Sequence, residues 1–245
     1  MLTKKIVLLA ALLVPGVAGA AATAHLDHAA TDIHNTASLQ RGARNFASYC
    51  LGCHSAKYVR WNRVAADLGI GEEQLEQSRS PAGAQPFDTM HSAMPAQQAT
   101  DWFGVAPPDL SLIARSRGVD YLYTFLRTFY ADPARPTGVN NLVMPNTAMP
   151  HVLAPVQGVK AAKIELVTHD GKTEEHIVGL VEGTPGTLSG AEYDEFVRDT
   201  VNFLDYIGEP VKAKRQSMGV WVVLFLLVFW LMTYLLKKEY WKDIR

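Results

Sequence analysis

Residues 216–236, QSMGVWVVLFLLVFWLMTYLL, form a run of 21 positions without a charged side chain. A helix of this length, rising 1.5 Å per residue, crosses the roughly 30 Å hydrocarbon core of a bilayer. Because no face of the run is polar, a buried helix of a soluble protein is the weaker alternative. Aromatic side chains suited to a membrane–water interface lie near its ends: Trp221, Trp230, Tyr234, Tyr240 and Trp241. The sequence predicts a transmembrane anchor over residues 211–236 and a short tail over 237–245.

The other end of the chain has the pattern of a secretory signal peptide. Lys4 and Lys5 precede an apolar run over residues 6–14, and small residues follow at 18–20. We expect cleavage after Ala20, with Ala22 as the second choice; an uncleaved membrane anchor is the alternative, but the apolar run is too short to span. Lysine and arginine flank residues 216–236 on both sides, so the signal peptide decides the orientation. It places residues 21–210 in a bacterial periplasm, anchored in the inner membrane, with the tail in the cytoplasm.

Both cysteines of the chain lie in one pentapeptide, CLGCH, at residues 50–54. A structural zinc site needs four ligands, and there is no second cysteine pair to supply them. A disulfide or a thioredoxin-type redox pair remains an alternative in an exported protein. The histidine directly after Cys53 favours covalent attachment of one c-type haem, in which Cys50 and Cys53 form thioethers and His54 is an axial ligand.

Residues 21–210 hold about one domain, for which we expect a mainly α fold with long loops and a small β-hairpin. Apolar periodicity predicts helices near residues 38–49 and 58–68, a third within 118–133 that stops at Pro133, and a last one within 189–210. Residues 189–192 offer a capping box for the last helix. A hairpin is expected within 163–181 with its turn at Asp170-Gly171, a long loop over 132–158, and a largely irregular segment with short helices over 71–100.

A haem iron with one histidine needs a sixth ligand or an open site, and this difference separates electron carriers from gas binders. Candidates occur throughout the downstream chain: Met90, His91, Met94, Met144, Met149, His151, His169 and His176. Met144 and Met149 lie in the loop NNLVMPNTAMPHVLAP, and each precedes a proline that stiffens the backbone. These two methionines are therefore favoured over His151, and spacing alone does not separate them.

Three stretches then show a resemblance to the cytochrome c1 family, the haem-bearing subunits of cytochrome bc1 complexes. They are QRGARNFASYCLGCHSAKYVR, APPDLSLIARSRGVDYLYTFL and NTAMPHVL. The resemblance implies that Met149 is the axial methionine and that residues 107–111, with Pro108, lie beside the haem. It also implies that Arg115 pairs with a haem propionate and that Tyr121 faces the haem. The extra cysteine pair of some relatives is missing here, and residues 71–100 match least.

The resemblance also implies a role in ubiquinol–cytochrome c reductase. In that role the chain receives electrons from a Rieske iron–sulfur protein and reduces a soluble c-type cytochrome. It is anchored on cytochrome b and in membrane lipid within a dimeric multi-subunit complex, and we expect no catalysis from this chain alone. Alternatives are a c-type subunit of a terminal oxidase and, less favoured, a haem-based gas sensor. Residues 21–210 carry 14 basic and 22 acidic side chains, which suits a basic protein partner and gives no basis for nucleic-acid binding.

Overall fold

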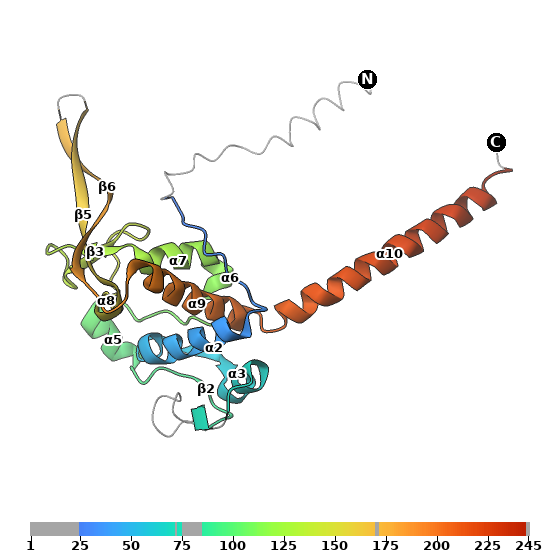
Figure 1. The fold of residues 1–245 in the computed structure, drawn as a ribbon, viewed down its shortest axis with the longest axis horizontal. Helices are drawn as coiled ribbons and strands as arrows, with labels where there is room; N and C mark the ends of the chain where they lie inside the picture. The colour runs from blue at the N-terminus through green and yellow to red at the C-terminus, as the bar shows by residue number, and fades with distance from the viewer. Residues whose placement is uncertain (1–24, 72, 75–84, 170–171, 244–245) are drawn as a thin grey trace.

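The computed structural model describes residues 25–71, 73–74, 85–169 and 172–243. The predicted signal peptide and the hairpin turn at Asp170-Gly171 lie outside these residues. Figure 1 shows a mainly helical body from which one long helix, α10, and one two-stranded ribbon, β5–β6, project in different directions. The predicted fold class, a mainly helical domain with small sheets and one apolar C-terminal helix, is confirmed.

The centre of the body is the packing of α2 (Thr36–Asn45) on α9 (Gly190–Gly208). The two backbones approach so closely that a Cβ built on Gly42 would lie 2.0 Å from the carbonyl oxygen of Asp199. Asp199 is 4 % exposed, and it accepts hydrogen bonds from the Ser38 hydroxyl and the Arg41 guanidinium. Glycine at position 42 therefore permits the helix crossing, and the buried carboxylate joins the two helices at that point.

The CLGCH pentapeptide begins where α2 changes its winding. A π-helical turn, η1 (Phe46–Cys50), follows α2 directly, so the predicted helix over residues 38–49 is present with a wider last turn. The next predicted helix begins later than expected. Residues 56–60 form strand β1 (Ala56–Arg60), which pairs with β2 (Thr89–Met90), and only α3 (Trp61–Leu68) is helical.

Several later elements also differ from the sequence prediction. α7 (Val119–Arg127) ends before Pro133, and the chain then forms β3 (Phe129–Ala131). The expected loop over 132–158 contains β4 (Val139–Asn141), which pairs with β3, and the short helix α8 (Ala154–Gln157). Two further helices precede α7: α5 (Ala96–Phe103), a short helix of the kind expected within 71–100 that extends three residues beyond it, and α6 (Ile113–Arg117), which was not predicted.

The predicted hairpin is present and longer than expected. β5 (Gly158–His169) and β6 (Lys172–Pro185) pair antiparallel, with His169 opposite Lys172. α9 begins with the predicted capping box, in which the Ser189 hydroxyl accepts from the Glu192 N–H and the Glu192 carboxylate accepts from the Ser189 N–H. The hydrophobic core lies between α2, α3, α7 and α9.

α10 (Lys212–Tyr240) contains the apolar run at 216–236 and is the one helix among the described residues that is long and apolar enough to cross a membrane. Two ion pairs tie its start to the end of α9. The Lys212 ammonium contacts both carboxylate oxygens of Asp205 at 2.9 and 2.7 Å, and Arg215 contacts Glu209 at 2.6 Å. The anchor is therefore joined to the helical body by charged contacts as well as by the chain.

Candidate functional site

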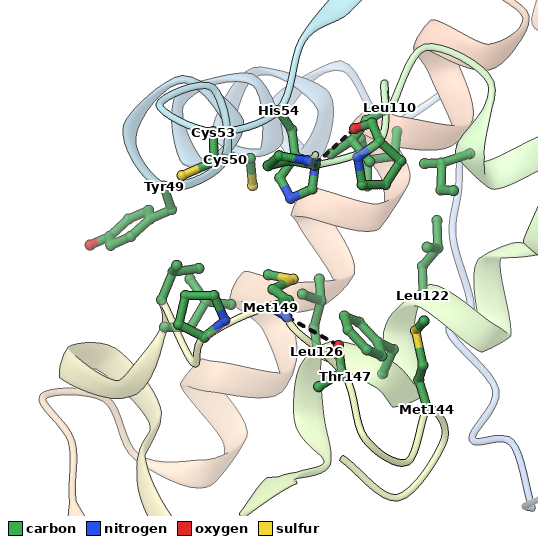
Figure 2. Close-up of a pocket in the computed structure, with 18 of the residues that line it drawn as sticks. Tyr49, Cys50, Cys53, His54, Leu110, Leu122, Leu126, Met144, Thr147 and Met149 are labelled. Carbon is green, nitrogen blue, oxygen red and sulfur yellow. Dashed lines mark hydrogen bonds between the residues drawn. The ribbon is translucent and has the colours of Figure 1, made fainter. Parts of the chain in front are cut away.

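A cavity of about 380 Å³ lies between α7, α9 and the segments that carry CLGCH, Pro-Pro-Asp and the Met-Pro loop. Its lining is almost entirely apolar. Figure 2 shows Cys50, Cys53 and His54 on one side, Met149 and Thr147 on the opposite side, and Met144 farther along the wall. Segments separated by about a hundred residues in the sequence thus contribute two thiols, one imidazole and two thioethers to one cavity.

The two thiols are free in this structure and sit on a helical turn that continues from η1. The N–H groups of Cys53 and His54 both donate to the Cys50 carbonyl, at 3.1 and 2.8 Å. Burial, with a smaller contribution from Cys53, raises the pKa of the Cys50 thiol to about 12. A redox-active C-x-x-C pair instead requires a lowered thiol pKa that yields a thiolate near neutral pH. The environment of Cys50 therefore argues against a thioredoxin-type redox function for Cys50 and Cys53.

His54 is held in one tautomer by a backbone acceptor. Its Nδ1 lies 2.8 Å from the carbonyl oxygen of Pro108, which can only accept, so Nδ1 carries the proton. Burial lowers the pKa of His54 despite that hydrogen bond, so the ring is neutral at physiological pH. Nε2 is left with its lone pair, as a metal-binding imidazole requires.

Pro108 is itself held by a set of hydrogen bonds between residues 107–111 and the chain after CLGCH. The Leu110 N–H donates to the Ser55 carbonyl at 2.8 Å, and the Asp109 carboxylate accepts from the backbone N–H of Lys57 at 2.9 Å and of Ser111 at 3.0 Å. Burial acts to raise the pKa of Asp109, but the hydrogen bonds from Ser111 and Lys57 outweigh it and keep the pKa below its usual range. The carboxylate is ionised and fixes the segment that orients His54.

The three ligand candidates of the Met-Pro loop differ in where they lie relative to the cavity. Met149 lines the cavity across from His54, and its N–H donates to the Thr147 hydroxyl at 3.3 Å. Met144 also lines the wall, but it is 45 % exposed and lies farther from the cysteines. His151 does not line the cavity; its ring stacks on Phe129 at 4.9 Å and its Nε2 contacts the Gly158 carbonyl. Met149 is the better placed of the two methionines.

Tyr121 lines the cavity, whereas Arg115 does not. The Arg115 side chain packs against Gly208 at the end of α9, and its charge, after the hydrogen bond from Arg215, helps to lower the pKa of Glu209. The arginine of α6 that lines the cavity is Arg117. Side chains two positions apart on a helix point in different directions, so both arginines of α6 cannot face the cavity. Arg115 thus lies outside the cavity wall, and its contact with a haem propionate stays a prediction.

The chain matches the cytochrome C1 family over residues 27–244. It belongs to this family. It is 48 % identical to cytochrome c1 of Allochromatium vinosum over 220 residues, 90 % of each chain. It is 45 % identical to a protein of Nitrosomonas europaea named ammonia monooxygenase gamma subunit, over 98 % of each chain. A cytochrome b/c1 of Bradyrhizobium diazoefficiens is 25 % identical over 84 % of this chain and 33 % of that one.

Membership of the cytochrome c1 family identifies the chain as an electron carrier and implies a covalent c-type haem. The residues present fit that group. Two thiols on one helical turn, a neutral imidazole with a free lone pair and a thioether opposite it all meet at an apolar cavity. These are the side chains that attach and ligate a c-type haem. Arg117 is a charged cavity residue that the sequence analysis did not single out, although it lies only two positions from Arg115.

Proposed function

We propose that this chain carries one haem c, joined to Cys50 and Cys53 by thioethers and ligated by His54 and Met149. The observation that carries the proposal is the convergence of these four side chains on a single apolar cavity. We further propose that Tyr121 and Pro108 border the group and that Arg117, rather than Arg115, is the cation nearest to it. A haem with histidine and methionine ligands supplies one-electron transfer at a raised reduction potential.

The residues of the chain perform three tasks in this proposal. Pro108 keeps His54 in the tautomer that can ligate. The apolar walls, which include Phe125 and Leu126, exclude water and so favour the iron state of lower net charge. The two cysteines make the attachment permanent, so that the group stays in place while protein partners bind and leave.

The biological role we propose is transfer of electrons from a Rieske iron–sulfur protein to a soluble c-type cytochrome within ubiquinol–cytochrome c reductase. The names of the relatives, including a cytochrome b/c1, support cytochrome b as the membrane partner. In this proposal the signal peptide over 1–20 is removed, the domain over 21–210 lies in the periplasm, α10 spans the bacterial inner membrane, and residues 237–245 are cytoplasmic.

A second candidate role is electron transfer as a subunit of an ammonia-oxidising complex. One observation favours it: the relative named ammonia monooxygenase gamma subunit. The tagged full chain, isolated from native membranes in mild detergent, distinguishes the two. Cytochrome b and a Rieske protein should co-purify, and the preparation should oxidise ubiquinol and reduce a soluble cytochrome c. Co-purification with ammonia-oxidising or terminal-oxidase subunits, without cytochrome b, would refute the bc1 role while leaving the haem assignment intact.

The ligand assignment is tested with a matched pair of variants. Met149→Leu should remove the sulfur-to-iron charge-transfer band of the ferric protein and lower the reduction potential, whereas Met144→Leu should retain both. Wild-type ferrous protein should not bind carbon monoxide readily, because both axial positions are filled; rapid binding would instead favour a gas sensor. Survival of the band in Met149→Leu and its loss in Met144→Leu would reverse the assignment.

A further inference from the structure

The loop that ends at Met149 begins with two buried asparagines. Asn140 and Asn141 lie on β4 and are 8 % and 1 % exposed. Neither is in the cavity wall, and neither was singled out by the sequence patterns. A buried amide is costly unless its N–H and C=O groups are hydrogen-bonded, so the partners of these two side chains show what the burial achieves.

Asn141 joins the loop to α7. Its Oδ1 accepts from the N–H of Val143 at 2.9 Å and of Met144 at 3.1 Å, which folds the chain into a turn directly after β4. Its Nδ2 donates to the carbonyl of Phe125 at 2.7 Å, in the last turn of α7. Phe125 also lines the cavity, so Asn141 fixes the loop to the helix that forms the adjacent wall.

Asn140 holds the second half of the same loop. Its Oδ1 accepts from the N–H of Asn146 at 2.7 Å, and its Nδ2 donates to the Asp132 carboxylate at 2.9 Å. Asn146 has a φ of 64°, a left-handed conformation that asparagine tolerates better than most residues. Thr147 follows, 4 % exposed, and its hydroxyl accepts the N–H of Met149. The hydrogen bonds of the two asparagines and of Thr147 thus hold successive parts of the loop that ends at Met149.

We propose that Asn140 and Asn141, together with Thr147 in the same loop, are positioning residues that hold the Met149 sulfur opposite His54 and keep Met144 farther along the cavity wall. This proposal rests on the function proposed above. A loop of this length without internal hydrogen bonds would sample many conformations, and binding the thioether would then cost that conformational entropy. The asparagine network restricts the loop before the ligand binds. It therefore lowers the rate at which Met149 leaves and strengthens the methionine ligation.

The decisive comparison is between Asn141→Asp and Asn202→Asp in the full-length haem protein. Asn202 is also 1 % exposed, and its Nδ2 donates to the Asp32 carbonyl at 2.7 Å, but it faces the α2 side of α9. In both variants a carboxylate oxygen replaces the amide N–H group that donates to a backbone carbonyl, so two acceptors face each other in a buried place. Both variants should therefore have a lower melting temperature than wild type. Only Asn141→Asp should speed the binding of imidazole to the ferric protein, which requires Met149 to leave. We expect roughly a tenfold increase, equivalent to about 1.4 kcal/mol.

A milder pair of variants keeps the test decisive if Asn141→Asp does not fold. Thr147→Val removes the acceptor of the Met149 N–H with little change of shape and should also speed imidazole binding and weaken the charge-transfer band; Thr147→Ser should restore both. Equal rates in Asn141→Asp and Asn202→Asp, or in Thr147→Val and wild type, would overturn the positioning role. Retention of the band in Met149→Leu would instead refute the ligand assignment, so the two failures are distinguishable.

Discussion

The guanidinium carbon of Arg117 lies 5.6 Å from the ring centroid of Tyr121, and both side chains border the cavity. The contact joins α6 to α7 across the single residue Gly118, whose φ of 88° suits glycine. The Tyr121 ring in turn stacks on Phe125 at 6.2 Å. A positive charge is thereby held at the wall of an otherwise apolar site by a chain of ring contacts.

Arg117→Gln should lower the reduction potential, because a nearby cation favours the reduced state, which carries one positive charge less. Coulomb's law with an effective dielectric constant near 20 gives a decrease on the order of tens of millivolts at about 10 Å. Arg115→Gln, whose side chain does not line the cavity, is the matched control and should lower the potential by less in a redox titration. A larger shift in Arg115→Gln than in Arg117→Gln would contradict the placement of the two arginines.

Gly42→Ala should destabilise the fold strongly, because the added methyl would lie 2.0 Å from the Asp199 carbonyl and 2.8 Å from the Phe203 Cβ. Separation of α2 from α9 should cost about 1–3 kcal/mol or more of unfolding free energy. Gly190→Ala, in the first turn of α9 with nothing within 4 Å of the new methyl, is the control and should be neutral or slightly stabilising. Equal unfolding midpoints for both variants would disprove the close crossing.

Asp120 should contribute stability at neutral pH that is lost in acid. A hydrogen bond from the Ala29 N–H, at 2.8 Å, and one from His28 keep its pKa below the usual range. The carboxylate is thus more easily ionised in the folded chain than in the unfolded one, whose pKa is about 3.9. Asp120→Asn should melt at a lower temperature than wild type at pH 7, and this difference should shrink as the pH falls through the unfolded-state pKa and then the lower folded-state pKa of Asp120. A gap that is constant from neutral to acid pH would argue against this linkage.

The acidic balance of residues 21–210, with 14 basic against 22 acidic side chains, should steer a basic electron acceptor. The second-order rate of electron transfer to a basic soluble cytochrome c should fall markedly between about 10 mM and 300 mM salt, as the Debye length drops through ~10 Å. An acidic cytochrome of similar potential serves as the control and should show no such fall. A rate that stays flat with the basic partner would exclude steering by this field.

Features encoded by local patterns could be predicted from the sequence. The capping box of α9, the CLGCH turn, the apolar run in α10 and the hairpin each depend on residues close together in the chain. The secondary-structure predictions were wrong where pairing with a distant segment determines whether the chain forms a strand or a helix. Phe129 continues the apolar stripe of α7, yet it forms β3 because β4, ten residues farther along, supplies the partner strand. Residues 56–60 likewise become a strand through pairing with Met90 and Thr89.

The residues of the candidate site also divide into those that a local motif identifies and those that only the folded structure identifies. Cys50, Cys53 and His54 follow from one motif, and the prolines after Met144 and Met149 reduced the sixth-ligand candidates to two. The choice between Arg115 and Arg117 depends on the rotation of a helix only five residues long, which no periodicity determines. The asparagines at 140 and 141 resemble ordinary loop residues, and only their burial and their hydrogen bonds connect them to Met149.

The central claim, that the two thiols hold a covalent haem, is tested most directly by mass spectrometry of the mature chain from a host competent in haem attachment. The intact mass should exceed that of the polypeptide by one haem, and the peptide containing Cys50 and Cys53 should carry the whole increment, with neither thiol available to an alkylating reagent. A mature chain of unmodified mass, with a disulfide between Cys50 and Cys53 or with two free thiols, would contradict the account.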